Sequence, residues 1–132
     1  MNKLKGHIID KTVVDDLCLL EISLCDNVFK SIVIDNRQSS NFNIGDKVEV
    51  LFKPSEVVLS KNKDIDISLQ NRLWCKVDEI EQGQLLSVLK LSYNGAFISS
   101  IITTQSLMAL KISLYDDVLA MVKTNEIMLL KC

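Results

Sequence analysis

The feature that most constrains the fold of this 132-residue chain is an internal repeat. With an offset of 69 residues, Leu20 aligns with Leu89, and one extra residue in the second copy changes the offset to 70. At that offset, residues 50–59 and 120–129 each contain an apolar run, a Lys-x-x-Glu turn and a second apolar run. A shared register with one single-residue gap indicates two copies of one unit.

The two copies cover most of the chain. They span residues 2–61 and 68–131, and the polar stretch that begins at Lys61 separates them. We therefore expect two domains, residues 1–63 and 64–132. Each is small for an independent domain, so tandem packing, strand exchange or oligomerisation is expected to add buried surface.

Each copy has the pattern of short β-strands joined by tight turns. In the first copy, apolar runs at 17–24 and 28–34 flank a hairpin turn. In the second copy, runs at 85–93 and 96–102 flank an Asn-Gly pair, which is the strongest short-range hairpin signal. Two further apolar runs close each copy, so each unit is expected to have five strands.

A short helix is expected after the second hairpin. Thr103 can serve as its N-cap, and the helix would extend to residue 110. The equivalent stretch, 35–42, is polar and forms either a short helix or only a turn. Five short strands in about 60 residues are typical of a small OB-like barrel. The predicted fold class is therefore all-β, with two tandem small OB-like five-stranded β-barrels, each with a short helix.

The composition excludes several classes of function. The chain has 15 Lys and Arg against 17 Asp and Glu, so it has no basic excess to neutralise nucleic-acid phosphates. Aromatic residues, 5% of the chain, are too few to stack bases. The sequence contains one His, no Gly-rich phosphate loop and no nucleophile–base set, which argues against an enzyme.

Patterns for membrane insertion, secretion and metal binding are also missing from the sequence. No apolar stretch approaches the roughly 20 residues that cross a bilayer, and the N-terminal residues lack the apolar core of a signal peptide. We therefore expect a cytoplasmic protein without membrane contact. No two of the four cysteines form a C-x-x-C pair, so no metal site is expected. Cys18 and Cys25 are interpreted as reduced packing residues.

Several motifs resemble those of the molybdenum-pterin-binding (Mop) domain family, also called molbindin or TOBE-like domains. The family's Ser-x-x-Asn opening resembles residues 68–71, and its Gly-Asp-x-Val turn resembles residues 45–48. Its helix-start segment resembles residues 101–106, and its closing Lys-Ala-Ser-x-Val strand resembles residues 53–57 and 123–127. The resemblance covers nearly the whole chain, and two tandem copies are similar to a stand-alone di-Mop protein.

The resemblance implies an oxyanion-binding protein. Proteins of this family bind molybdate or tungstate at interfaces between units, often within a trimer of two-unit chains. Because molybdate is a tetrahedral dianion, its site should offer only donors, such as backbone N–H, hydroxyl, amide and ammonium groups. The resemblance therefore implies molybdate or tungstate as the ligand and a homo-oligomer, with a trimer favoured over a dimer. Apolar side chains expected on outer faces also favour an oligomer, among them Ile98, Ile102, Leu107 and Met108.

Carried over position by position, the family's ligand residues fall on nine positions of this chain. These candidate oxyanion-binding residues are Ser68, Gln70, Asn71, Thr103, Ser106, Lys123, Thr124, Lys53 and Ser55. Gln70 stands where the family has an arginine, which removes one positive charge from the anion site. In the first copy, the helix-start positions are Ile34 and Arg37, so its site is at best half complete.

The candidates also have ordinary structural interpretations. Lys53 and Lys123 could be solvated loop lysines. Ser68 and Asn71 could close a turn at the junction, and Thr103 could be only an N-cap. Two functions therefore stay open. One is an intracellular oxyanion-binding protein for storage, buffering or sensing of molybdate or tungstate. The alternative is a regulatory or interaction module of the same fold that has lost oxyanion binding.

Overall fold

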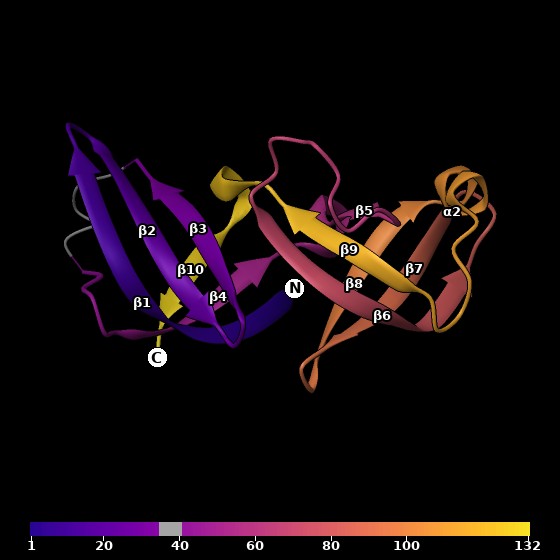
Figure 1. The fold of residues 1–132 in the computed structure, drawn as a ribbon, viewed down its shortest axis with the longest axis horizontal. Coiled ribbons are helices and arrows are strands. Elements are labelled where there is room, and N and C mark those ends of the chain that lie inside the picture. Colours follow the sequence, from indigo (N-terminus) through magenta and orange to yellow (C-terminus); the bar gives the residue numbers. More distant parts are fainter. Residues whose placement is uncertain (35–40) are drawn as a thin grey trace.

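The computed structural model describes residues 1–34 and 41–132, which have an all-β fold (Figure 1). Within these residues, ten strands form two five-stranded antiparallel sheets, accompanied by one short α-helix. None of the helices that the structure describes is long and apolar enough to cross a membrane. The all-β tandem architecture predicted from the repeat is therefore confirmed.

The strand order of the first sheet is β10-β4-β1-β2-β3. Its strands are β1 (Asn2–Val14), β2 (Leu17–Leu24), β3 (Asn27–Val33), β4 (Lys47–Phe52) and β10 (Met128–Lys131). The order of the second sheet is β5-β9-β6-β7-β8. Its strands are β5 (Val58–Ser60), β6 (Asn71–Gln82), β7 (Leu86–Tyr93), β8 (Ala96–Thr103) and β9 (Asp117–Val122). The helices are the 3-10 turns η1 (Pro54–Glu56) and η2 (Thr124–Glu126) and the α-helix α2 (Thr104–Leu110).

The two copies exchange their last strands. β5, from the first copy, pairs with β9 of the second sheet, and β10, from the second copy, pairs with β4 of the first. Lysines at equivalent positions of the repeat hold the exchanged strands in place through hydrogen bonds. Lys131 Nζ donates to the Asn41 carbonyl at 2.8 Å and lies 3.3 Å from the Asp46 carboxylate. Lys61 Nζ makes the corresponding bond to the Lys111 carbonyl at 3.2 Å. Each sheet is therefore complete only with a strand from the other copy.

Two buried asparagines join the copies reciprocally. The Asn71 side chain accepts from the Lys30 N–H at 2.7 Å and donates to the Lys30 carbonyl at 2.9 Å. Asn2, at the equivalent position of the first copy, makes the same pair of bonds with the N–H and carbonyl of Ser99. Each amide thus satisfies both backbone groups of one residue across the junction. The equivalence of the two contacts relates the copies by an approximate twofold axis.

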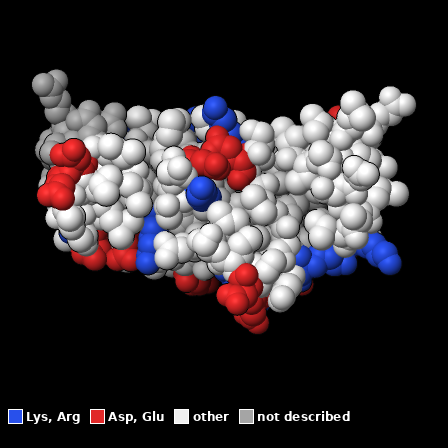
Figure 2. Space-filling view, turned by 90° about the horizontal axis from the view of Figure 1, so that it is seen from above, with Lys and Arg blue, Asp and Glu red and all other residues white. Residues whose placement is uncertain are grey.

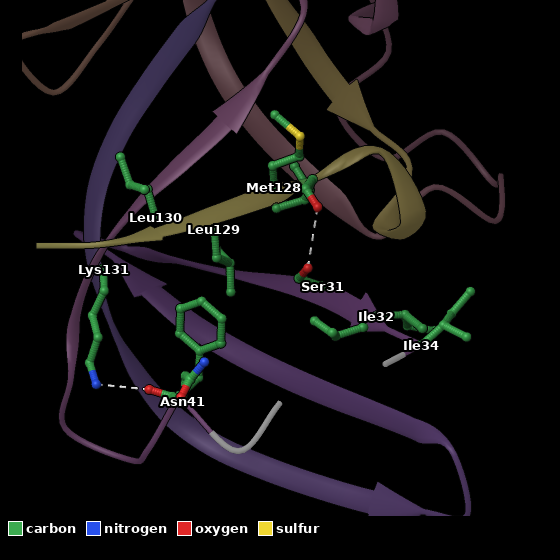
Figure 3. A pocket seen from close by; sticks show the side chains of 11 residues that line it. Ser31, Ile32, Ile34, Asn41, Met128, Leu129, Leu130 and Lys131 are labelled. Atoms are coloured by element: carbon green, nitrogen blue, oxygen red, sulfur yellow. Dashed lines mark hydrogen bonds between the residues drawn. The ribbon is translucent and has the colours of Figure 1, made fainter. Parts of the chain in front are cut away.

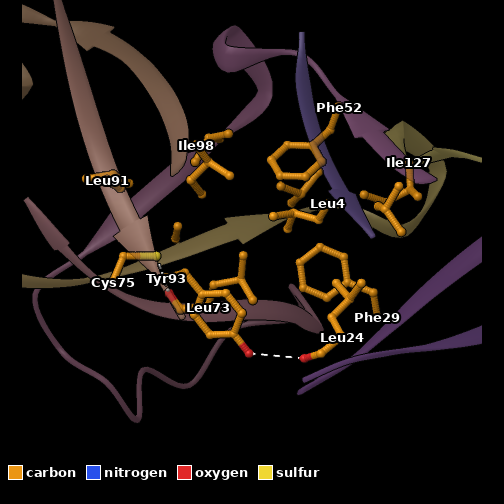
Figure 4. Close-up of a cluster of buried hydrophobic side chains, with 14 of the residues drawn as sticks. Leu4, Leu24, Phe29, Phe52, Leu73, Cys75, Leu91, Tyr93, Ile98 and Ile127 are labelled. Atoms are coloured by element: carbon orange, nitrogen blue, oxygen red, sulfur yellow. Dashed lines mark hydrogen bonds between the residues drawn. The ribbon is translucent and has the colours of Figure 1, made fainter. Parts of the chain in front are cut away.

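The copies share one hydrophobic core. Along β2 and β7, buried and partly exposed side chains alternate, as expected for strands with one face packed on a core. The core runs through both copies (Figure 4), and the rings of Phe29 and Phe52 lie 6.3 Å apart between centroids. The Tyr93 hydroxyl donates to the Leu24 carbonyl at 3.1 Å. Tyr93 and Leu24 are equivalent positions of the repeat, so this bond lies near the twofold axis.

The hairpins and the second-copy helix agree with the sequence prediction. β7 and β8 meet at Asn94-Gly95, whose φ angles of 46° and 81° fit a tight hairpin turn. α2 follows its N-cap Thr103, whose Oγ1 accepts from the Ser106 N–H at 3.0 Å. In the first copy, β2 and β3 form the expected hairpin. The helix or turn expected over 35–42 falls mostly on residues 35–40, which lie outside the described residues.

Three expectations about exposure are wrong. Ile98 and Leu107, expected on outer faces, are buried, with only 2% and 3% of their surface exposed. Ile98 alternates with the exposed Phe97 along β8 and therefore faces inward, and Leu107 lies on the side of α2 that packs against β7 and β8. Cys25, expected to pack, is exposed because it occupies the β2–β3 turn with a φ of 52°.

The buried asparagines generate a stability prediction. In Asn71→Ala, we expect the free energy of unfolding to fall by about 2–4 kcal/mol, because the fully buried amide is lost and two partly buried backbone groups of Lys30 lose their partners. Urea unfolding followed by circular dichroism measures this change. Asn125→Ala, at an exposed position of η2, is the matched control and should change stability little. Equal stability of the two variants would contradict the bridging role of Asn71.

Candidate functional site

The Lys-x-x-Glu turns of both copies belong to one junction. η1 packs against β8 of the second sheet, and η2 packs against β3 of the first. Buried serines fix both contacts. The Ser100 hydroxyl donates to the Val57 carbonyl at 3.1 Å, and the Ser31 hydroxyl donates to the Ile127 carbonyl at 3.5 Å. These turns carry or directly follow the candidate residues Lys53, Ser55, Lys123 and Thr124.

The two closing turns each carry a glutamate at the same position of the repeat. These residues are Glu56 in η1 and Glu126 in η2, and Glu126 affects the pKa of Glu56. Partial burial raises the pKa of Glu56, and the hydrogen bond and charge of Glu126 raise it further, while Lys53 opposes the shift. Sequence reasoning missed this pair, although the repeat contained a signal for it. A residue near a twofold axis meets its own copy, and both glutamates occupy one repeated position.

The structure brings Gln70 and Lys123 to neighbouring strand ends. Asn71 begins β6 and pairs with Val122, which ends β9. One residue further out, Gln70 and Lys123 leave the sheet next to each other, and both are exposed. Asn71 differs from them because its side chain is fully buried and bonded to Lys30. Its contacts are therefore those of a structural bridge.

Thr103 and Ser106 lie apart from these donors. Thr103 ends β8, and Ser106 is in the first turn of α2, which Figure 1 places at the end of the molecule away from the first sheet. The Thr103 hydroxyl accepts from the Ser106 N–H and donates to the Ser106 Oγ at 2.9 Å. Both residues are exposed. Within one chain, the nine candidates therefore do not form a single cluster.

The linker between the copies is held by one arginine. Arg72 Nε donates to the Leu69 carbonyl at 2.8 Å, and its two Nη atoms donate to the carbonyls of Ile65 and Ile67, each at 2.9 Å. The candidate residue Ser68 lies within this segment and is exposed. No sequence pattern identified Arg72, because its three partners are backbone groups that are similar in every residue type.

A groove of about 730 Å³ lies between β3 and β10 in the first sheet (Figure 3). Most of its described lining is apolar, including Ile32, Met128 and Leu130. Among the described lining residues the one cation is Lys131, which is paired with the Asp46 carboxylate. The described part of its lining therefore offers no free charge and few donors for a tetrahedral dianion.

The exposed candidate residues offer hydrogen-bond donors and positive charge, which suit an anion better than a metal ion. Across residues 1–34 and 41–132, no group of three or more His, Cys, Asp or Glu side chains could hold a metal ion. Figure 2 shows acidic and basic side chains together near the middle of one face, and most of the remaining visible surface carries neither. An uncharged surface of this extent is compatible with contacts between molecules.

Comparisons with known proteins confirm the fold expected from the resemblance. No family model and no curated protein matches the sequence. Among solved structures, the chain is similar to the cytoplasmic molybdate-binding protein ModG, in a crystal form with molybdate bound. The match has a TM-score of 0.89 and 21% identity and covers 97% of this chain and 94% of ModG. A molybdate-binding protein from Sporomusa ovata matches with a TM-score of 0.49 and 33% identity, over 51% of this chain and 100% of that protein.

The carboxyl pair generates a prediction about pH. The folded state raises the pKa of Glu56 above its ordinary value of 4.5, so protonation of this group favours folding. This contribution is fully present below pH 4.5 and is lost as the pH rises through the raised pKa. At pH 8, Glu56→Gln should therefore be more stable than the wild type, by at most about 1 kcal/mol because solvent screens the charges.

Urea unfolding between pH 4 and pH 8 measures this effect. The stability advantage of Glu56→Gln should shrink as the pH falls, since the wild-type carboxyl then gains its proton. Glu81→Gln, at an exposed position near the end of β6, is the control and should show no comparable gain. A Glu56→Gln protein that is less stable than the wild type at pH 8 would rule out repulsion between the carboxylates.

Proposed function

We propose that this protein binds molybdate or tungstate in the cytoplasm and stores, buffers or senses the oxyanion without catalysing a reaction. The observation that carries the proposal is the match over 97% of the chain to molybdate-bound ModG, at a TM-score of 0.89. The exposed donors around Gln70 and Lys123 add chemical support. They offer an amide and an ammonium group at adjacent strand ends, as binding of a dianion requires.

The proposed ligand site uses groups from more than one place. Gln70, Lys123 and Thr124 lie at one end of β6 and β9, with Ser68 on the linker. Lys53 and Ser55 occupy the equivalent turn of the first copy. We do not assign a ligand contact to Asn71, because both ends of its amide are bonded to Lys30.

A complete donor set requires a neighbouring molecule. Thr103 and Ser106 lie at the far end of the second sheet from the first, so another copy would have to bring a lysine to them. Exposed apolar side chains surround that end, including Leu85 with 82% and Met108 with 62% of their surface exposed. These groups support a homo-oligomer, and we retain a trimer over a dimer as the proposed assembly.

Three observations favour a second function, an interaction module of the same fold that no longer binds oxyanions. Gln70 supplies no charge at its strand end. Ionised carboxylates at Glu56 and Glu126 would repel an anion held by the closing turns. The Thr103 and Ser106 hydroxyls are also bonded to each other, so a ligand would have to replace that contact.

Calorimetric titration with molybdate, tungstate and sulfate distinguishes the two functions. We expect heat from molybdate and tungstate, and at least about tenfold weaker binding in Lys123→Met, which loses a charge-assisted hydrogen bond. Lys76→Met removes an exposed lysine elsewhere on β6 and should bind within about twofold of the wild type. Absence of heat with millimolar molybdate and tungstate would refute oxyanion binding and leave the interaction module.

A further inference from the structure

The three hydrogen bonds of Arg72 fix the direction of the linker backbone. Among the described residues no carboxylate pairs with its guanidinium, which donates to the carbonyls of Ile65, Ile67 and Leu69 at 2.8–2.9 Å. These carbonyls belong to every second residue, so three separate peptide groups converge on one cation. A planar guanidinium with several fixed donors can hold such a set, whereas a flexible ammonium cannot do so equally well.

Convergence of the carbonyls determines where the N–H groups of the same peptides point. In a trans peptide, the C=O and N–H bonds point in opposite directions, and no cis peptide is present in the described chain. The carbonyls of Ile67 and Leu69 share their peptides with the N–H groups of Ser68 and Gln70. These N–H groups therefore point away from Arg72. No hydrogen bond to either one is found among the described residues.

We propose that Arg72 is a positioning residue that presents the peptide N–H groups of Ser68 and Gln70 to the oxyanion. This inference rests on the proposed function and deepens it. Gln70 leaves the sheet beside Lys123, so the presented N–H groups and a free ammonium lie at the same strand end. The charge of Arg72 also acts through the peptides, because a carbonyl that accepts from a cation makes its own N–H a stronger donor.

A purely structural role for Arg72 makes different predictions. Arg72 and Trp74 are on the outer face of β6, opposite Met121 and Leu119 of β9. Met121 and Leu119 are buried although they lie outside the main core. In a purely structural role, Arg72 would hold the linker over these two side chains and shield them from solvent. A cover alone would affect stability, but the Ser68 and Gln70 amides would not respond to ligand.

The test combines variants with residue-resolved titration of the full chain by molybdate. In the wild type, the amide resonances of Ser68 and Gln70 should show the largest shifts in a ¹⁵N–¹H spectrum. Arg72→Lys keeps the positive charge but not the three-way geometry, and Arg72→Ala loses both. Each should bind molybdate about tenfold more weakly in calorimetry, as expected when charge-assisted, prearranged donors are lost.

Lys63→Met is the matched control. Lys63 Nζ lies 5.6 Å from the Trp74 ring centroid on the same linker, so this change removes a nearby charge without touching the held carbonyls. Its molybdate affinity should stay within twofold of the wild type. Thermal unfolding without ligand shows whether each variant is folded, and Arg72→Lys keeps the test decisive if Arg72→Ala does not fold.

The outcomes separate this inference from the function on which it rests. Molybdate binding by the wild type without shifts at Ser68 and Gln70 would overturn the role of Arg72 and leave the proposed function intact. Wild-type affinity in Arg72→Lys would also overturn it, because charge alone would then suffice. If the wild type binds no molybdate, the proposed function fails, and the positioning role fails with it.

Discussion

The exchange of the last strands is the constraint on which the rest of this structure depends. β5 completes the second sheet and β10 completes the first, so neither copy contains all the strands of its own sheet. A unit of about 60 residues buries little apolar surface alone, and a shared core compensates for that. Exchange also requires the chain to cross the junction twice. The two crossings are the turns η1 and η2, which is why the repeated Lys-x-x-Glu segments meet there.

This arrangement puts two opposing chemical demands on the junction. The turns carry the lysines that an oxyanion would need, and they also carry Glu56 and Glu126, of which Glu126 raises the pKa of Glu56. Protonation of Glu56 relieves its repulsion by Glu126, and ionisation restores it. At the strand end where Gln70 lies beside Lys123, the proposed donors also include the peptide N–H groups of the linker.

The sequence predicted the features that depend on neighbouring residues. It did not predict those that depend on which copy a segment pairs with. The hairpin at Asn94-Gly95 and the N-cap at Thr103 are local, and both are confirmed. The partner of each closing strand was left open, because an apolar run such as 127–130 has the same pattern whether it pairs within its own copy or with the other copy. Arg72 was missed for a related reason. Its hydrogen-bond partners are backbone carbonyls, which every residue type has, so the sequence does not indicate them.

The differences between the copies indicate how their tasks are divided. Lys3 occupies the position equivalent to Arg72, and a lysine offers a single point charge where the guanidinium holds three carbonyls. The first copy therefore lacks the means to fix a donor loop in the way the second does, even though its junction contacts through Asn2 are equivalent. Under the proposed function, the second copy would supply the positioned donors. The first copy would supply β5 to the second sheet and the opposing half of the junction. The fold would therefore need the first copy even though its own anion site is incomplete.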